Sequence, residues 1–254
     1  MALKQRDLSY FDHGQHENAA YWPCFGGKPD FKNAVVVDLG CGHGSLCVDI
    51  AKSGARRVIG LDLNPRLIAF ANENLKVNFP ELMGIVEFRL QDLRDTPEAN
   101  VDYFVSKDTF EHVTEMESVL AEIRKRLKPG GRLYTGFGPL WKSPFGDHGR
   151  THVWIPWGHL MFPEQVLARW RNWLVRKSAS QSPASSFHEL GLSALSLASY
   201  HRLFEASGLT IVDWKVNAQA SPVSRLFSLI RLIPFLKEYF SLTLHCVLEN
   251  QRVS

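Results

Sequence analysis

"VVVDLGCGHGS", residues 35–45, joins an apolar, β-branched run to a glycine-rich turn and the start of a helix. The apolar run predicts a buried strand. Gly40, Gly42 and Gly44 let the backbone turn tightly and pass close to a ligand, and the amides that open the next helix favour an anionic group. The stretch therefore predicts an α/β fold with a ligand at the end of its first strand.

Two residues separate this turn from the pattern of dinucleotide-binding proteins. That pattern needs Gly or Ala at the position where this chain has Ser45. Asp38 also places a carboxylate at the end of the strand, two residues before the first glycine. A carboxylate suits a ligand with an ammonium group better than a pyrophosphate, so the sequence disfavours an NAD-dependent oxidoreductase.

Strand-like and helix-like segments alternate along the chain, which indicates right-handed crossovers and a mostly parallel sheet. Asn64 is the expected N-cap of the second helix, and Thr114 with Glu117 has the spacing of a capping box. We predict a Rossmann-like sheet of seven strands with helices on both faces. The expected strands are 34–40, 56–63, 84–92, 101–108, 132–138, 209–216 and 240–249, and the expected helices are 45–54, 64–77, 114–131, 163–177 and 199–208.

The alternation stops after Gly138 and resumes near residue 193. The segment between these points, 139–192, is rich in Trp, Pro, His, Ser and Arg. We expect it to form a cap inserted after the fifth strand. Within it, residues 178–186 have the low-complexity composition of a surface loop.

Length and composition narrow the class of protein. A chain of 254 residues with 45% hydrophobic residues fits one α/β domain with insertions. The net charge of +3 is too small to indicate a nucleic-acid partner. The polar N-terminus and the lack of a long apolar run predict a cytoplasmic protein, and the four cysteines, which lack a zinc spacing, are expected to be free thiols.

Two further aspartates follow the next strands of the predicted sheet. Asp62 ends the second strand and Asp92 ends the third, so both are expected at the same sheet edge as Asp38. In open parallel sheets ligands bind outside the carboxyl ends of the strands. An acid in the place of Asp62 can bind both hydroxyls of a ribose, and one in the place of Asp92 can accept from an adenine amino group.

These motifs together resemble the class I S-adenosylmethionine-dependent methyltransferases. VVDLGCGHG, VIGLDLN, LQDL, VDYFVSKDTFEHV and LKPGGRLYTGFG occur in the family's order, and ASYHRLFEASGLTIVDWKV matches a later helix-strand unit. The resemblance implies S-adenosylmethionine as cofactor and one methyltransferase domain over residues 1–254. Its expected parts are an N-terminal lid (1–33), a cofactor-binding core (34–138), a substrate-cap insertion (139–192) and the C-terminal part of the sheet (193–254), with a short insertion at 218–236.

The resemblance also implies roles for single residues. Asp38 would lie near the methionine amino group, Asp62 would bind the ribose hydroxyls, and Asp108 would point toward the acceptor. Glu111 and His112 are interpreted as residues that only organise the next turn. The implied cofactor-binding set is Asp38, Gly40, Cys41, Gly42, Gly44, Asp62, Leu63, Asp92, Leu93 and Lys107.

One stretch of the cap, "GDHGRTHVWIPWGHLMF" at residues 146–162, holds three histidines. A metal ion bound by His148, His152 and His159 is not expected, because glycines and a proline break any helix that would align them and no later acid or thiol completes the set. His148 and His152 are instead candidate catalytic groups together with Asp108, as general bases or acceptor-orienting groups. His159 is expected to be structural.

Methyl transfer from a sulfonium is an in-line displacement that needs aligned reactants and exclusion of water. A hydroxyl acceptor also needs a base for its proton. We expect a methyltransferase that acts on the hydroxyl oxygen of a small molecule. S- or N-methylation without a base, and a cofactor-binding protein without catalysis, remain as alternatives.

The acceptor side of the site is expected from the lid and the cap. Its candidate residues are Tyr10, His13, Trp154 and Trp157. The helix 163–177 carries Val166, Leu167, Trp170 and Leu174 on one face, which is expected to pack as an aromatic core behind a basic surface. A local excess of Lys and Arg leaves contact with a lipid-like substrate or a membrane surface open, and the sequence does not decide between a monomer and a homodimer.

Overall fold

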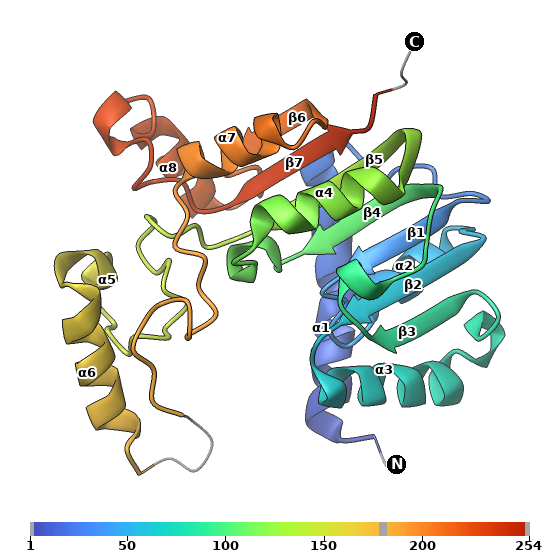
Figure 1. The fold of residues 1–254 in the computed structure, drawn as a ribbon, viewed down its shortest axis with the longest axis horizontal. Helices are drawn as coiled ribbons and strands as arrows, with labels where there is room; N and C mark the ends of the chain where they lie inside the picture. The colour runs from blue at the N-terminus through green and yellow to red at the C-terminus, as the bar shows by residue number, and fades with distance from the viewer. Residues whose placement is uncertain (1–2, 178–181, 252–254) are drawn as a thin grey trace.

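One sheet of seven strands forms the centre of the computed structural model, which describes residues 3–177 and 182–251 (Figure 1). The strand order is β3-β2-β1-β4-β5-β7-β6. Neighbouring strands from β3 to β5 are parallel, whereas β7 is antiparallel to both β5 and β6. The predicted mostly parallel α/β sheet is confirmed. Residues 178–181 of the predicted surface loop lie outside the described part of the chain.

Helices and strands alternate in the first half of the chain, as the sequence predicts. The strands are β1 (Val35–Leu39), β2 (Arg57–Asp62), β3 (Val86–Leu90), β4 (Val101–Lys107), β5 (Leu127–Phe137), β6 (Thr210–Val216) and β7 (Leu244–Glu249). The α-helices are α1 (Gln5–Tyr21), α2 (Ser45–Lys52), α3 (Pro65–Asn78), α4 (Met116–Arg126), α5 (Gly158–Met161), α6 (Glu164–Val175), α7 (Leu197–Ala206) and α8 (Pro222–Ile230). Short 3-10 turns are η1 (Trp22–Phe25), η2 (Pro80–Leu82), η3 (Leu93–Asp95), η4 (Phe110–His112) and η5 (Pro234–Leu236).

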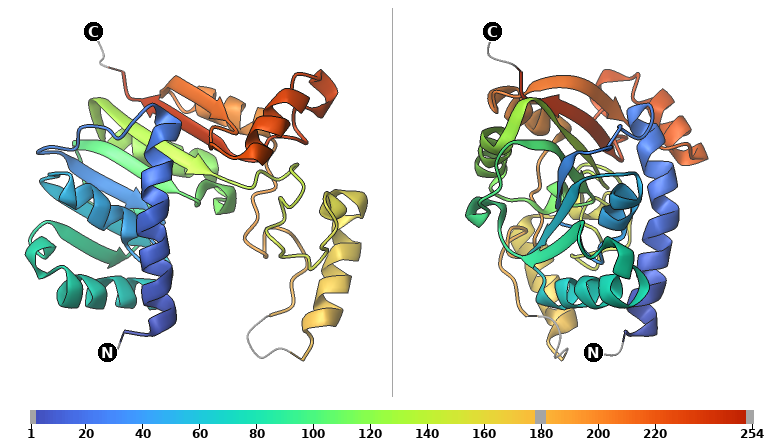
Figure 2. Two further views of the ribbon diagram at one scale, coloured as in Figure 1. Left: turned by 180° about the vertical axis from the view of Figure 1, so that it is seen from behind. Right: turned by 90° about the vertical axis from the view of Figure 1, so that its right-hand side faces the viewer.

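Both faces of the sheet are covered by helices (Figure 2). Val36 and Val37 in β1 show why, since successive side chains of a strand point to opposite faces. Val36 belongs to a core cluster with residues of α1, α2 and α3, and Val37 belongs to a second cluster with residues of α4 and α7. Because both side chains are fully buried, β1 is a central strand and its carboxyl end lies at the middle of the sheet edge.

The glycine-rich turn between β1 and α2 needs glycine at defined positions. Gly40 has a φ of 73° and Gly44 a φ of 83°, a left-handed conformation that other residues rarely adopt. A Cβ atom on Gly40 would lie 2.2 Å from Oγ1 of Thr109, and one on Gly44 would lie 2.4 Å from the ring of Phe88. The turn is therefore held against β3 and against the segment that follows β4.

The predicted start of α3 is confirmed, whereas the predicted start of α4 is wrong. The side chain of Asn64 accepts hydrogen bonds from the backbone N–H groups of Arg66 and Leu67 at the start of α3, which confirms the predicted N-cap. The predicted capping box at Thr114 is wrong, because α4 begins only at Met116 and its N-cap makes no side-chain hydrogen bond. Met116 is 1% exposed, so packing of this side chain in the core sets the start of the helix.

The insertion after β5 carries α5 and α6, which stand apart from the sheet beyond the carboxyl ends of its strands (Figures 1 and 2). Helix α6 contacts the segment near residues 182–184, where Arg171 donates to the carbonyl of Ser182 at 2.9 Å. The predicted inner face of α6 is wrong in part. Leu167 is buried as expected, but Trp170 is 47% exposed. Because α6 packs on one chain segment rather than on the sheet, its buried face is rotated toward Arg171.

Substitutions in the glycine turn test its fit. Both Gly40→Ala and Gly42→Ala add a Cβ atom at a left-handed position, which costs about 1–2 kcal/mol in each. Only Gly40→Ala also adds a clash, because the space beside Gly42 is open within 4 Å. We expect Gly40→Ala to lower the free energy of unfolding by about 1–3 kcal/mol more than Gly42→Ala in urea denaturation without ligand. Equal losses would contradict the packing against Thr109.

Candidate active site

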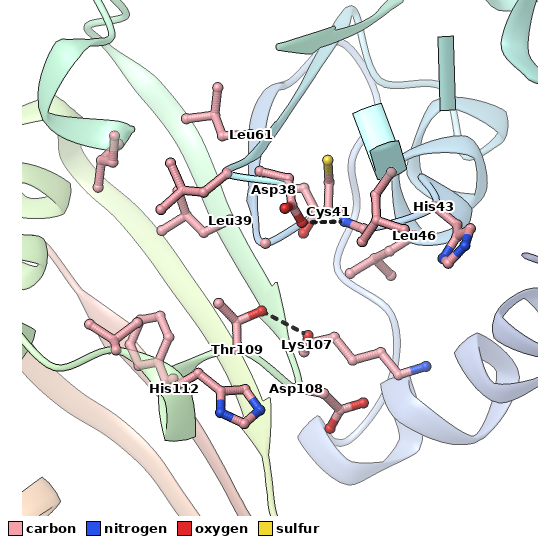
Figure 3. A pocket seen from close by; sticks show the side chains of 18 of the residues that line it. Asp38, Leu39, Cys41, His43, Leu46, Leu61, Lys107, Asp108, Thr109 and His112 are labelled. Carbon is pink, nitrogen blue, oxygen red and sulfur yellow. Dashed lines mark hydrogen bonds between the residues drawn. The ribbon is translucent and has the colours of Figure 1, made fainter. Parts of the chain in front are cut away.

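A cavity of about 740 Å³ lies at the carboxyl edge of the sheet. Figure 3 shows Asp38 from the end of β1, Cys41 from the glycine turn, Lys107 from the end of β4, and Asp108 and His112 from the segment that follows β4. Helix α1 supplies further lining residues. Of the ten residues predicted to bind the cofactor, the cavity brings together Asp38, Gly40, Cys41, Gly42, Asp62, Leu63, Asp92, Leu93 and Lys107. Gly44 is not in the lining, and its role is to place the turn against Phe88.

Asp38 is a buried carboxyl group at the end of β1. It is 1% exposed, and its Oδ2 accepts a hydrogen bond from Sγ of Cys47 at 3.1 Å. Burial raises the pKa of Asp38 to about 7, while the thiol of Cys47 opposes this rise. Lys107, a cation that lowers this pKa, is itself paired with Glu17 at 3.1 Å. A ligand ammonium group would therefore stabilise the ionised form of Asp38.

Asp62 joins the end of β2 to the glycine turn. Its Oδ2 accepts from the backbone N–H of Gly42 at 2.9 Å, and its Oδ1 accepts from the N–H of Asn64 at 2.8 Å. Each carboxylate oxygen has a second acceptor position. The side chain is thus fixed in orientation while it still can bind two hydroxyl groups, and Leu63 beside it is 69% exposed.

Asp92 follows β3, and its carboxylate is hydrogen-bonded to the side chain of Arg94. Nε and Nη2 of Arg94 donate to its two carboxylate oxygens at 2.9 Å each. These hydrogen bonds lower the pKa of Asp92, so the carboxylate is ionised and still has acceptor positions toward the cavity. Leu93 is 6% exposed and lies beneath the same part of the cavity.

Helix α1 forms one side of the cavity through residues that the sequence motifs do not identify. Oδ1 of Asp7 lies 2.7 Å from Nη1 of Arg66 and 3.2 Å from Nε2 of His43. Tyr10, predicted as a substrate residue, lines the cavity, and its ring lies 4.6 Å from that of His43. His13 lies outside the lining and pairs with Glu17 at 3.3 Å. The N-terminal segment is therefore both packed on the domain and part of the cavity wall.

Asp108 lies at the cavity next to Lys107. Its φ of 52° is left-handed, a conformation that Asp adopts more readily than most residues, and its N–H donates to the carbonyl of Gly136 at 2.9 Å. Enclosure by the surrounding protein raises the pKa of Asp108 to about 6, with Lys107 opposing the rise and Glu17 adding to it. A carboxylate with this pKa can accept a proton near neutral pH.

A second polar cluster adjoins the cavity and consists of Glu111, His112 and His148. One ligand atom from each residue lies within 4.8 Å of the others, and the two imidazole rings are 4.9 Å apart. His112 also lines the cavity. Burial raises the pKa of Glu111 to about 8, and burial lowers the pKa of His148 to about 4. The sequence does not predict this cluster, because His148 reaches the other two residues only through the path of the insertion.

Other predicted residues of the cap lie elsewhere. His152, Trp154 and Trp157 are not among the lining residues of the cavity. Trp154 is 75% exposed, and Nε1 of Trp157 donates to the carbonyl of Tyr239 at 3.2 Å. His159 is buried, as expected of a structural residue, and its Nε2 lies 2.6 Å from the carbonyl oxygen of Trp141. Within the described part of 139–192, no residue lines the cavity.

Comparisons with known proteins agree with this geometry. Residues 30–137 match a family model described as a methyltransferase domain. Magnesium-protoporphyrin O-methyltransferase of Rhodobacter capsulatus is 35% identical over 99 residues, which cover 38% of this chain and 42% of that protein. Ribosomal protein L11 methyltransferase of Herpetosiphon aurantiacus is 32% identical over 127 residues, which cover 42% of this chain and 38% of that protein.

A solved structure extends the likeness over most of the fold. The geranyl diphosphate C-methyltransferase of Streptomyces coelicolor A3(2), in complex with Mg²⁺, geranyl-S-thiolodiphosphate and S-adenosyl-L-homocysteine, superposes with a TM-score of 0.60 at 16% identity. The match covers 92% of this chain and 76% of that one. It supports the fold, whereas the sequence matches cover less than half of the two curated relatives.

The prediction of a methyltransferase is confirmed for residues 30–137, which match a methyltransferase domain. The matched residues include strands β1 to β5 and the acids at the carboxyl edge of the sheet. Strands β6 and β7 complete the sheet.

Exposed apolar side chains gather on the two insertions. The rings of Trp170 and Trp173 in α6 are stacked at 5.6 Å, and Leu229, Leu232 and Phe235 at α8 and η5 are each more than 60% exposed. Among the described residues, no helix combines the length and apolar character needed to cross a bilayer. Contact of these side chains with a lipid-like substrate or a membrane surface stays a prediction.

The buried acids predict how stability depends on pH in the absence of ligand. Asp38 and Glu111, with pKa values of about 7 and 8, keep protons that the unfolded chain, with carboxyl pKa values near 4, has already released. The unfolded state therefore binds fewer protons, and stability falls as pH rises toward 8. Below about pH 6.5 the lowered pKa values of His148 and His245 act in the opposite direction.

We expect the thermal midpoint to fall between pH 6.5 and 8, with a slope of at most about 1.4 kcal/mol per pH unit for each proton. Glu111→Gln should flatten this decline, because the amide does not titrate. Glu117→Gln makes the same change at an exposed position of α4 and should leave the slope unchanged. Equal slopes for wild type and Glu111→Gln in differential scanning calorimetry would contradict the buried state of Glu111.

Proposed function

We propose that the protein transfers the methyl group of S-adenosylmethionine to a small-molecule acceptor. The observation that carries the proposal is the set of aspartates at successive strand ends, which face one cavity of about 740 Å³ in a methyltransferase domain. A cavity of about 300–1,000 Å³ is typical of small-molecule sites. The curated relatives act on acceptors as different as a porphyrin and a ribosomal protein. The size of the cavity therefore supports a small-molecule acceptor better than the names of these relatives do.

The methionine, ribose and adenine parts of the cofactor would each have a binding group in the cavity. Asp38 would bind the methionine ammonium group, which offsets the burial of its carboxylate. Asp62 would bind the ribose hydroxyls through the acceptor positions that Gly42 and Asn64 leave available. Asp92 and Leu93 would contact the edge and the face of adenine, and the turn at Gly40 and Cys41 would pass beneath the methionine.

The acceptor would approach from the side of Asp108. In the proposed reaction, an oxygen lone pair of the acceptor forms the new bond to the methyl carbon. The bond from methyl carbon to sulfur breaks, and its electron pair returns to sulfur. The hydroxyl proton passes to the carboxylate of Asp108, whose pKa of about 6 suits this role. Neither His148 nor His152 belongs to the lining of the cavity, whereas Asp108 does, so Asp108 is the supported base among the three predicted catalytic residues.

The cofactor assignment predicts a direct binding result. Calorimetric titration should show binding of S-adenosylmethionine and of S-adenosylhomocysteine. Asp62→Ala should weaken both by about 10–150-fold, because hydrogen bonds to a charged group contribute about 1.5–3 kcal/mol. Asp213→Ala removes an aspartate of β6 that is paired with Lys215 outside the cavity, and should bind like wild type. Failure of both ligands to bind wild type would refute the proposed function.

The base assignment predicts a pH profile. Formation of S-adenosylhomocysteine is measured with phenols, vicinal diols, thiols and amines as acceptors. With an accepted hydroxyl, kcat/KM should decline below about pH 6, where Asp108 becomes protonated. Asp108→Asn should lower kcat/KM by about 10²–10⁴-fold and remove this decline.

Asp12→Asn, on the exposed side of α1, is the matched control and should keep the wild-type profile. Turnover with thiols or amines alone would favour the S- or N-methyltransferase alternative. Cofactor binding with no turnover of any class would favour a cofactor-binding protein without catalysis. An Asp108→Asn variant with unchanged kcat/KM would show that another group takes the proton.

A further inference from the structure

We propose that Glu111, His112 and His148 form a binding site for a divalent transition-metal ion, and that the bound ion holds oxygen atoms of the acceptor beside the methyl donor. Metal binding follows from the cluster alone. The contact with the acceptor rests on the proposed function, and the two parts are tested separately below.

Each imidazole has one ring nitrogen with a lone pair that is not protonated. Nδ1 of His112 lies 2.7 Å from the carbonyl oxygen of Gly191, and a carbonyl can only accept, so this nitrogen carries the proton. Nε2 of His148 lies 3.1 Å from the carbonyl oxygen of Pro139 and is protonated for the same reason. The second nitrogen of each neutral ring is then unprotonated. A histidine that donates one N–H to a carbonyl and offers its other nitrogen has the usual arrangement of a metal ligand.

Glu111 supplies the acidic member of the cluster. Its side chain is buried at 5% exposure, and Oε2 has no hydrogen-bond partner among the described residues. Burial of a carboxylate oxygen without a partner is costly. Glu111 is buried and both imidazoles are half-buried. Together with the two unprotonated ring nitrogens, this gives three electron-pair donors partly shielded from water, and a cation satisfies all three at once.

The surrounding structure fixes the directions of these donors. His148 lies in a turn built around Asp147, which is 1% exposed and accepts from the N–H and the hydroxyl of Thr151 at 3.2 and 2.5 Å. On the other side, the N–H of Ser193 donates to the carbonyl of Glu111 at 3.1 Å. Three segments far apart in the sequence thus meet at the cluster. Ligands within 4.8 Å of one another need only a small inward movement to reach the separations of about 3–4 Å around an ion with bonds near 2.1 Å.

The ligand types select the class of ion. Two imidazoles and one carboxylate suit Zn²⁺, Fe²⁺, Co²⁺ or Mn²⁺, whereas Mg²⁺ and Ca²⁺ prefer sites made of oxygen atoms. Three protein ligands leave coordination positions open, as catalytic sites do. His112 lines the cavity, so the open positions adjoin the space beside Asp108. An acceptor with two neighbouring oxygen atoms would fill them, and the ion would lower the pKa of its hydroxyl group.

Metal binding is tested on the full chain after removal of metal with EDTA. Isothermal titration with ZnCl₂ and elemental analysis after dialysis should give one ion per chain, and CoCl₂ should give visible absorption bands. His148→Ala and Glu111→Gln should each weaken Zn²⁺ binding by about 100-fold or more, since even the residues that orient metal ligands contribute about 10–100-fold. His152→Ala is the matched control, because His152 also lies at a left-handed position of the same loop but outside the cluster.

Zn²⁺ affinity distinguishes a metal site from a polar network that binds no ion. Cofactor binding, measured separately, tests the proposed function. His148→Ala, Glu111→Gln and His152→Ala should retain binding of S-adenosylhomocysteine, which shows that they are folded. Asp62→Ala should keep its Zn²⁺ affinity while its cofactor affinity is weakened. Absence of a stoichiometric ion, or equal Zn²⁺ affinity in wild type, His148→Ala and Glu111→Gln, would overturn the proposal. Retained Zn²⁺ binding without cofactor binding would leave the metal site standing and refute the proposed function.

The contact with the acceptor has its own readout. 3,4-Dihydroxybenzoate is the probe, because its two adjacent hydroxyl groups can bind one ion. Added to the Co²⁺-loaded protein with S-adenosylhomocysteine present, it should shift the visible absorption bands, and His152→Ala should give the same shift. An unchanged spectrum would refute the placement of acceptor oxygen atoms on the ion.

Discussion

The burial of Asp38 at the carboxyl end of β1 is the constraint on which the site depends. β1 is covered on both faces, so the carboxyl group at its end is removed from water. The glycine turn then leads the chain away, and the buried Asp38 lies at the wall of a cavity. Because Asp62 binds the N–H of Gly42 in that turn, the ends of β1 and β2 are fixed relative to each other, and the cavity takes its shape from both.

The insertion after β5 affects the site through a few residues beside η4, namely Pro139, His148 and Gly191, rather than as a cover. Helices α5 and α6 stand apart from the sheet (Figure 1), and their aromatic side chains pack locally or remain exposed. The first loop of the insertion returns to η4, where the ring of His148 contacts that of His112. The substrate-cap part of the predicted domain organisation therefore has a structural link to the site, although the described residues of 139–192 do not close the cavity.

The sequence predicts those features of the site that depend on the ends of neighbouring parallel strands. Asp38, Asp62 and Asp92 lie at or just beyond the carboxyl end of a strand, and the sheet brings strand ends to one edge regardless of the loops. The pairing of Glu111 and His112 with His148 was not predictable in this way, because it depends on the path of a loop with no regular structure. The prediction that Trp170 lies on the buried face of α6 was wrong for a related reason. Periodicity shows that Trp170 lies on the apolar face of the helix, but it does not show that little of the chain packs against this residue.

The electrostatics of the site follow from three acids that share one poorly solvated region. Asp38, Asp108 and Glu111 all have raised pKa values, and neighbouring charges add to the rise, since Asp62 acts on Asp38 and Asp108 acts on Glu111. Such a group of carboxyls becomes fully ionised only when cations offset it. In the proposed complex, the ammonium group would offset Asp38, the metal ion would offset Glu111, and the sulfonium would add a further positive charge to the region. Transfer of the methyl group removes that sulfonium charge, and the proton taken up by Asp108 removes one negative charge from the same region, so the charge balance of the site is preserved through the reaction.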